Sequence, residues 1–187
     1  MRILFHGKVF SKGAEGQIIN FIQELFKKNI CVYFTNYFFQ LIQKKIIVHN
    51  NTEINTLDSI ESCDKKIDYL ICFGGDGTIL DATTIVKNYN IPIIGINTGR
   101  LGFLATISKH EISDLMEDLI NKRFKLTNRA LLRVDVKNTQ TEFPYALNEI
   151  SVSSKENSSM INIKVFLNEE FLNTYWADGL IISTPTG

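Results

Sequence analysis

The chain has 187 residues, of which 44% are hydrophobic and 21% charged, an ordinary composition for a globular protein with a packed core. Its 20 lysines and arginines equal its 20 aspartates and glutamates, so it lacks the basic footprint of a nucleic-acid-binding protein. Three cysteines without a CxxC pair and three histidines without metal-ligand spacing predict neither a disulfide framework nor a structural zinc site.

The first ten residues, MRILFHGKVF, contain too short an apolar run for a signal sequence or a membrane span. We therefore expect a cytoplasmic protein that binds neither a membrane nor a nucleic acid.

As far as about residue 125, apolar strand patterns alternate with amphipathic helix patterns. Strands are predicted at 2–5, 30–34, 46–49, 67–73 and 91–96, and helices at 15–29, 37–45, 78–88 and 110–124. The polar residues 50–62 predict a loop followed by a helical turn. Such alternation is typical of βαβ units and of a parallel, doubly wound sheet.

From Arg129 onward the pattern changes to strands without a convincing helix. We predict strands at 130–136, 145–153, 160–167, 170–177 and within 178–187, with a turn at 168–170. The predicted fold class is therefore α/β. A parallel doubly wound N-terminal domain, residues 1–125, is followed by part of an antiparallel β-rich domain, residues 126–187. Nothing closes the strands before the final Thr-Pro-Thr-Gly, so we expect a C-terminally incomplete chain.

The sequence CFGGDGT, residues 72–78, lies where a buried strand ends and a helix begins. Ligands of open α/β sheets bind at such ends, where glycines can adopt positive φ and helix amides attract anions. A carboxylate at Asp76 beside a phosphate fits phosphoryl transfer, in which a substrate hydroxyl lies between the two. The alternative is a tight turn in which Asp76 caps the helix. The spacing matches neither a P-loop nor a GxGxxG fingerprint.

A second glycine loop, NTGRLGF at residues 97–103, follows the next predicted strand, so the two loops should lie side by side. Arg100 would then meet a phosphate and Phe103 would stack on a base. In the alternative, Leu101, Phe103 and Leu104 fill the core and Arg100 is solvated.

Two further motifs lie in the β-rich half. Asn148 and Glu149 interrupt an apolar strand pattern, and one of them should face inward, where ribose hydroxyls and a base edge would satisfy it. An ordinary turn or sheet-edge pair is the alternative.

The segment YWADGLIISTPTG repeats the acid–glycine pairing at Asp178-Gly179 and offers the hydroxyls of Thr184 and Thr186. Trp176 would line a pocket in one interpretation and pack in the core in the other.

In this order and at this separation, the four motifs resemble those of the bacterial NAD kinase family: GGDGT at 74–78, NTGRLGF at 97–103, Asn-Glu at 148–149 and DGLIISTPTG at 178–187. The resemblance covers essentially the whole chain. It implies phosphorylation of the 2′-hydroxyl of the adenosine ribose of NAD, which forms NADP. The implied donor is ATP or polyphosphate, and the implied cofactor is a divalent metal, expected to be Mg²⁺.

The resemblance also implies roles for residues. Asp76 is expected to be the general base, while the phosphate contact expected of Arg100 follows from its place in the second loop. The expected phosphate-donor loop consists of Gly74, Gly75, Gly77 and Thr78. The expected NAD-binding residues are Asp76, Gly77, Phe103, Asn148, Glu149, Ser159, Trp176, Asp178 and Thr186. Ser159 stands where some relatives have histidine, and Trp176 stands where many have arginine.

In family members the NAD site borrows residues from a neighbouring subunit, so a homodimer or homotetramer is expected. Two other functions remain open. One is a different GGDG kinase that acts on lipids or sugars, although lipid kinases usually carry a Gly-Thr-x-Asn-Asp loop where this chain has NTGRLGF. The other is a non-catalytic NAD-binding fragment, and we expect the isolated 187-residue chain to be weakly active or inactive.

Overall fold

The computed structural model describes residues 1–8, 13–48, 53–99, 102–155 and 160–187, which form two compact units, Met1–Thr127 and Asn128–Gly187. Unit 1 contains a six-stranded sheet in the order β3-β2-β1-β4-β5-β6, and all of its neighbouring strands pair in parallel. The strands are β1 Arg2–Gly7, β2 Cys31–Thr35, β3 Asn55–Leu57, β4 Tyr69–Gly74, β5 Ile93–Asn97 and β6 Ile107–Ser108. The strand order reverses between β1 and β4, which confirms the predicted doubly wound α/β fold.

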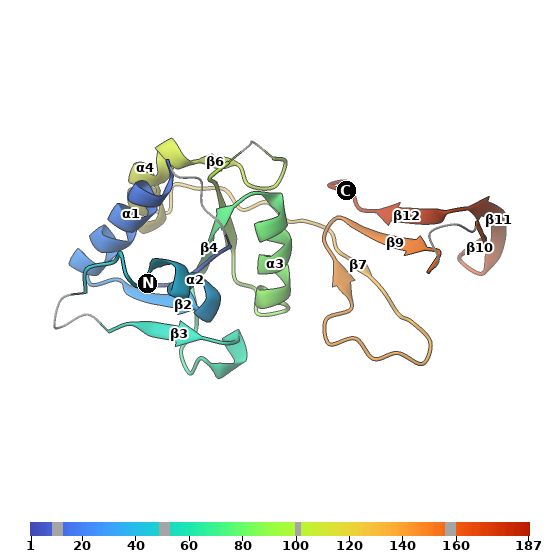
Figure 1. Ribbon diagram of the computed structural model, residues 1–187, viewed down its shortest axis with the longest axis horizontal. Coiled ribbons are helices and arrows are strands. Elements are labelled where there is room, and N and C mark those ends of the chain that lie inside the picture. Colours follow the sequence, from blue (N-terminus) through green and yellow to red (C-terminus); the bar gives the residue numbers. More distant parts are fainter. Residues whose placement is uncertain (9–12, 49–52, 100–101, 156–159) are drawn as a thin grey trace. The chain divides into compact units, whose positions relative to one another are not determined.

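Helices cover both faces of this sheet. They are α1 Glu15–Lys27, α2 Asn36–Ile42, α3 Asp76–Val86 and α4 Ile112–Ile120, with 3₁₀ turns at Ile60–Ser62 and Lys109–Glu111. Figure 1 shows α1 and α4 together on one side of the sheet and α3 on the other. The segment before α4 carries a capping box, in which the Ser108 hydroxyl accepts from the His110 N–H at 3.2 Å and Glu111 accepts from the Ser108 N–H at 2.8 Å.

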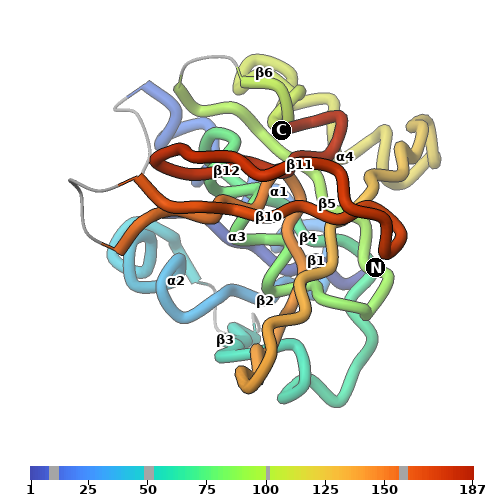
Figure 2. Tube along the Cα trace, turned by 90° about the vertical axis from the view of Figure 1, so that its right-hand side faces the viewer, coloured from blue at the N-terminus to red at the C-terminus, as the bar shows by residue number. Residues whose placement is uncertain are grey.

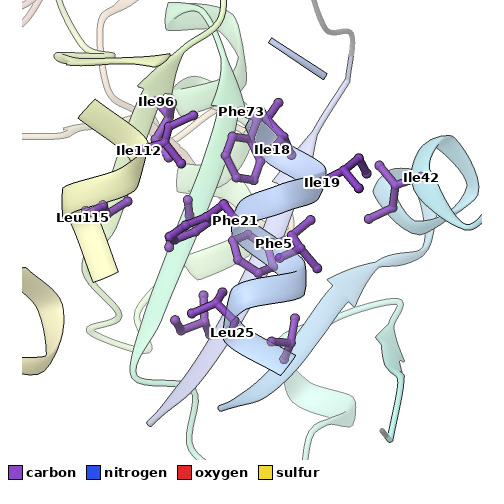
Figure 3. Packing of buried hydrophobic residues seen from close by; sticks show 14 of the residues in the cluster. Phe5, Ile18, Ile19, Phe21, Leu25, Ile42, Phe73, Ile96, Ile112 and Leu115 are labelled. Carbon is purple, nitrogen blue, oxygen red and sulfur yellow. The ribbon is translucent and has the colours of Figure 1, made fainter. Parts of the chain in front are cut away.

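The main core lies between the sheet and α1. Alternate residues of the strands, such as Phe5 on β1 and Phe73 on β4, point to this face and meet Ile18, Ile22 and other apolar residues spaced along α1 (Figure 3). The Phe5 ring centroid lies 5.5 Å from that of Phe73 and 5.8 Å from that of Phe34. This aromatic cluster holds β1, β2 and β4 together beneath their carboxyl ends.

Three predictions in unit 1 differ from the structure. Residues 46–48 of the predicted strand at 46–49 are not in a strand, because the Ile46 N–H bonds back to the Ile42 carbonyl at 3.2 Å and the buried Ile46 side chain packs on the core. The third strand, β3, comes later, within the segment predicted to be a loop. The helix predicted from Thr78 begins two residues earlier, at Asp76.

Unit 2 consists of three antiparallel strand pairs, which confirms the predicted change to antiparallel β structure. The pairs are β7 Leu132–Arg133 with β8 Tyr145–Ala146, β9 Glu149–Ser153 with β12 Gly179–Ser183, and β10 Ile161–Leu167 with β11 Glu170–Ala177. The predicted turn between the last pair contains Asn168 and Glu169, both at positive φ, as a tight hairpin turn requires. After the single residue Asp178, β12 follows β11 and lies against β10 (Figure 2).

The strand predicted at 145–153 is broken into β8 and β9. At the break, the carbonyls of Leu147 and Asn148 accept hydrogen bonds from Thr184 instead of from a strand partner. The strand predicted at 130–136 pairs only at residues 132–133. In the part of the chain that the structure describes, we find no helix with the length and apolarity needed to cross a membrane.

Candidate functional site

Two loops lie side by side at the carboxyl edge of the parallel sheet. The GGDGT turn, residues 74–78, follows β4, and the second loop, described over 97–99 and 102–105, follows β5. Gly74 and Asn97 are paired residues at the ends of these adjacent strands, and the Thr98 N–H donates to the Gly74 carbonyl at 3.3 Å. The predicted proximity of the two loops is therefore confirmed.

Asp76 is the first residue of α3, and its carboxylate points to the second loop. Oδ2 accepts from the backbone N–H of Phe103 at 2.8 Å, while Oδ1 accepts from Leu104 at 3.0 Å and from Ala105 at 3.1 Å. The alternative in which Asp76 caps the helix was wrong, because Gly75 occupies the N-cap position and α3 has no side-chain cap. The carboxylate joins two loops rather than closing one helix.

These hydrogen bonds determine the charge of the group. Burial raises the pKa of Asp76, but the N–H donors of Phe103, Leu104 and Ala105 lower it by more, so the pKa lies below its usual value. Asp76 is therefore ionised at neutral pH. A carboxylate offers about four acceptor positions, two on each oxygen. Among the described residues, which leave out 100 and 101, the three amides leave one position open, and it belongs to Oδ2.

No glycine that the structure describes has a positive φ, so the glycines of the two loops are not needed for backbone conformation. They differ in what surrounds their missing side chains. A Cβ on Gly74 would collide with the Thr78 side chain, and a Cβ on Gly102 would collide with the Asp76 carboxylate. Gly75 and Gly77, in contrast, have nothing within 4 Å of a built Cβ. Two glycines therefore permit close packing inside the site, and two leave open space over the GGDGT turn.

Phe103 is held by its backbone while its ring projects outward. Its side chain is 88% exposed, whereas Ala105, two residues later, is fully buried. The alternative that placed Phe103 in the core was therefore wrong. Arg100 and Leu101, to which the sequence assigned a phosphate contact and a core position, lie outside the described residues.

In unit 2, the end of the chain folds back on the break between β8 and β9. The buried Thr184 donates its hydroxyl to the Leu147 carbonyl at 2.7 Å and its N–H to the Asn148 carbonyl at 2.8 Å. The Thr184 hydroxyl also accepts from the Thr186 N–H at 3.2 Å. This threonine corner, residues 147–149 and 184–187, brings Asn148, Glu149 and Thr186 together.

The two polar side chains of the corner differ in exposure. Asn148 is half-buried and Glu149 is exposed. The Oδ1 atom of Asn148 is buried and has no hydrogen-bond partner among the described residues. Buried acceptors are nearly always satisfied, so this atom calls for a donor from outside the described chain.

The remaining predicted residues of unit 2 lie along β11 and at its end. Asp178 is exposed at the junction with β12, where its carbonyl accepts the Ser154 N–H at 3.1 Å. Trp176 is 73% exposed, so the alternative that packed it in the core was wrong. No side-chain hydrogen bond of either residue to the threonine corner is present among the described residues. Ser159 lies outside them.

Sequence reasoning missed two residues of these sites. Gly102 is only one letter of the NTGRLGF loop in the sequence, although its missing side chain makes room for Asp76. Thr184 was noted only as a hydroxyl, although it organises the threonine corner. The Thr-Pro-Thr spacing was a usable signal for Thr184, whereas no local pattern relates Gly102 to an aspartate 26 positions earlier.

The described residues contain no group of three or more His, Cys, Asp or Glu that could hold a metal ion. A half-open hollow of about 400 Å³ lies between α1 and α4, where Gln17, Phe21 and Met116 are among its lining residues. None of the predicted site residues lines it, so we base the site on the contacts of Asp76 instead.

Known family profiles match segments of both units of the chain. The profile of the ATP-NAD kinase N-terminal domain matches residues 18–124, and that of the ATP-NAD kinase C-terminal domain matches residues 147–187. The chain is 41% identical over 195 residues to an NAD kinase of Christiangramia forsetii and 40% identical over 193 residues to one of Flavobacterium psychrophilum. Both matches cover 100% of this chain and 64% of the relative, so the chain spans a little under two thirds of these relatives' length.

Two solved structures are similar in fold. Yeast NADH kinase complexed with NADH superposes with a TM-score of 0.83 at 23% identity, covering 100% of this chain and 58% of the other. An NAD kinase from Archaeoglobus fulgidus in complex with ATP superposes with a TM-score of 0.64 at 24% identity, covering 98% of this chain and 60% of the other.

Proposed function

This chain belongs to the ATP-NAD kinase family, and we propose that it transfers the γ-phosphoryl group of ATP to the 2′-hydroxyl of the adenosine ribose of NAD, forming NADP and ADP. The observation that carries the proposal is the Asp76 carboxylate, which is ionised and has one open acceptor position on Oδ2 beside an exposed aromatic ring. Polyphosphate is an alternative donor.

In the proposed reaction, the ribose 2′-hydroxyl donates a hydrogen bond to Oδ2 of Asp76. The 2′-oxygen attacks the γ-phosphorus, a new O–P bond forms, and the bond from the γ-phosphorus to the bridging oxygen of ADP breaks. The hydroxyl proton passes to Oδ2 late in this step, as the developing phosphate ester makes it acidic. The lowered pKa keeps Asp76 ionised at neutral pH but also makes it a weak base, so it would accept the proton only late in the step, when the hydroxyl has become acidic.

The donor phosphates are proposed to lie over the GGDGT turn. Gly75 and Gly77 leave open space there, and the first amides of α3 present the positive end of the helix dipole. Thr78 is buried beneath the turn, where its N–H donates to the Gly75 carbonyl at 3.0 Å. Arg100 is retained from the sequence as a further phosphate contact.

A divalent metal, proposed to be Mg²⁺, would neutralise part of the charge of the donor phosphates. The described residues offer no protein cage for it. A site with few protein ligands is typical of Mg²⁺, because proteins usually hold Mg²⁺ through one or two carboxylates together with substrate phosphates. The one acceptor position that the three amides leave on Asp76 is assigned to the ribose hydroxyl, so the metal would be held mainly through the donor phosphates.

The NAD-binding residues are proposed on two kinds of support. The exposed ring of Phe103 is suited to stack on adenine, and the unpartnered Oδ1 of Asn148 is suited to accept from a ribose hydroxyl or an adenine amine. Glu149 and Thr186 share the threonine corner with Asn148. Gly77, Ser159, Trp176 and Asp178 rest on the sequence motifs alone. We further propose a cytoplasmic homo-oligomer, a dimer or a tetramer.

The test supplies NAD, ATP and Mg²⁺ and measures NADP with an NADP-specific dehydrogenase. It uses the 187-residue chain and any longer form of the protein that contains it. Asp76→Asn should lower kcat by about a hundredfold or more, because general-base catalysis contributes on this scale. Asp81→Asn is the matched control, since Asp81 lies on the same helix and pairs with Lys8 at 2.6 Å.

Two results would contradict the proposal. One is the absence of NADP from every form tested. The other is normal turnover by Asp76→Asn. Parallel assays with diacylglycerol, a sphingoid base and sugar phosphates as acceptors cover the other GGDG kinases, and preferential phosphorylation of any of these would replace NAD as the proposed substrate.

A further inference from the structure

The most constrained side chain of the candidate site is Asp76, and most of its constraint comes from another loop. The backbone N–H groups of Phe103, Leu104 and Ala105 donate to its carboxylate over 2.8 to 3.1 Å. We call these three hydrogen bonds the carboxylate clamp. Charge-assisted hydrogen bonds are stronger than neutral ones, so the clamp fixes the backbone of three successive residues.

The clamp depends on the glycine that precedes it. A Cβ built on Gly102 would stand closer than 3.0 Å to both oxygens and to the Cγ of Asp76, a separation that real Cβ atoms essentially never show. The obstacle is a carboxylate fixed at the start of a helix, not the free end of a long side chain. Any residue other than glycine at position 102 must therefore displace either the carboxylate or the loop.

The flanks of the clamp are also fixed. On one side, the Thr98 N–H bonds to the Gly74 carbonyl. On the other side, Ala105 is buried against β5, so closely that a Cβ on Gly95 would stand 3.0 Å from the Ala105 Cα. The Phe103 ring is therefore exposed, whereas its backbone N–H is held by Asp76 and the loop is fixed on either side, at Thr98 and at Ala105.

We propose that Asp76 positions the second loop through the carboxylate clamp in addition to accepting the substrate proton, and that Gly102 is the positioning residue on which both tasks depend. The three donors assign the proton to Oδ2, the oxygen with an open acceptor position. The same carboxylate therefore sets the location of the Phe103 ring and of the proton acceptor. The proton-accepting part rests on the proposed function, whereas the clamp does not.

Because Asp76 both accepts the proton and holds the loop of Phe103, disturbing its hydrogen bonds should impair proton transfer and NAD binding at the same time. Gly102→Ala keeps the Asp76 carboxylate and the Phe103 ring but shifts one relative to the other. A shift of about 1 Å can lower turnover on the order of a hundredfold. We expect Gly102→Ala to lower kcat and to raise the KM for NAD while the KM for ATP stays within about twofold. Asp76→Asn also changes the group that accepts the ribose hydroxyl, so the KM for NAD of Gly102→Ala, which keeps the carboxylate, is the readout of the positioning role.

The loop can be observed without any substrate. A reporter with Phe103→Trp and Trp176→Phe carries a single tryptophan, because Trp176 is the chain's one native tryptophan. Fluorescence anisotropy decay then measures the mobility of the ring at position 103. Adding Asp76→Ala or Gly102→Ala should increase the fast component of the decay. The matched controls are Asp81→Ala on the same helix and Gly16→Ala, where a Cβ meets nothing within 4 Å.

The two readouts separate the clamp from the proposed function. Increased mobility at position 103 in Asp76→Ala supports the clamp whether or not NADP is formed. Unchanged mobility in both Asp76→Ala and Gly102→Ala, with circular dichroism like that of the parent, would overturn it. If Gly102→Ala does not fold, Asp76→Ala decides the question, because it removes atoms and creates no collision. In an active form, an unchanged KM for NAD in Gly102→Ala would equally refute the positioning role.

Discussion

The Asp76 carboxylate accepts the backbone N–H of Phe103 at 2.8 Å, although the two residues belong to loops that follow different strands. The proposed proton acceptor and the proposed adenine-stacking ring are thus joined by one hydrogen bond. Because β4 and β5 are parallel neighbours, both loops leave the same edge of the sheet and can make this contact without distorting either strand.

The ring of Phe103 should contribute to NAD binding and not to folding. Phe103→Ala removes an 88% exposed side chain, so the melting temperature should stay unchanged. Loss of stacking on a base should weaken NAD binding by about 1–3 kcal/mol, while Phe103→Tyr should retain it. Equilibrium dialysis with labelled NAD measures the affinity, and Tyr89→Ala is the control for an exposed aromatic residue of the same unit. Wild-type affinity in Phe103→Ala would exclude the stacking role.

Thr184 should stabilise unit 2 through its hydroxyl. Thr184→Val keeps the shape of the side chain but removes the donor to Leu147 and the acceptor for the Thr186 N–H. Leaving buried polar groups unpaired costs about 1–3 kcal/mol. We expect a lower melting temperature and weaker NAD binding, since Asn148 is part of the same corner. The exposed Thr174→Val on β11 is the control, and equal effects of the two substitutions would contradict this assignment.

The aromatic cluster beneath the site should dominate the stability of unit 1. Phe5 is fully buried and stacks on Phe34, Phe38 and Phe73. Phe5→Ala should cost about 3–5 kcal/mol through lost burial and the cavity that remains. Urea denaturation followed by circular dichroism measures the loss, with Tyr37→Ala as an exposed aromatic control. A loss below about 1 kcal/mol would mean that the cluster collapses around the cavity.

His6 should make unit 1 less stable in mild acid. Burial lowers its pKa, Asp81 opposes this shift and Lys8 adds to it, so the folded-state pKa lies below the value of about 6.5 in an unfolded chain. The unfolded state therefore binds more protons. Above about pH 6.5, His6 is neutral in both states and unit 1 keeps its full free energy of unfolding. This free energy decreases as the pH falls from about 6.5 through the folded-state pKa.

His6→Gln should therefore flatten the decline in melting temperature between about pH 7.5 and pH 5. Gln can keep a hydrogen bond to Thr35, whose hydroxyl lies 3.2 Å from His6 Nδ1. The exposed His110→Gln serves as the control. A decline identical to that of the wild type would show that other groups cause the acid sensitivity.

The strand that carries the GGDGT turn could be recognised from local sequence, and so could the strand before the second loop. Both are short, mainly apolar runs with a glycine at or just after their end, as buried parallel strands often are. The expected pairing of the two loops follows from their order along the chain. Residues 46–48 illustrate the limit, because an equally apolar segment became the end of a helical turn once Ile46 packed on the core.

By itself, the sequence determined the α/β pattern, the change to antiparallel strands and the identity of the motif residues, because these depend on local periodicity and on residue type. Only the tertiary structure decided what the motif residues do to one another. It placed the Asp76 carboxylate on three amides 27 to 29 positions away, turned the Phe103 ring outward and left Asn148 Oδ1 without a partner among the described residues. Such contacts join segments distant in the chain, so no local pattern encodes them.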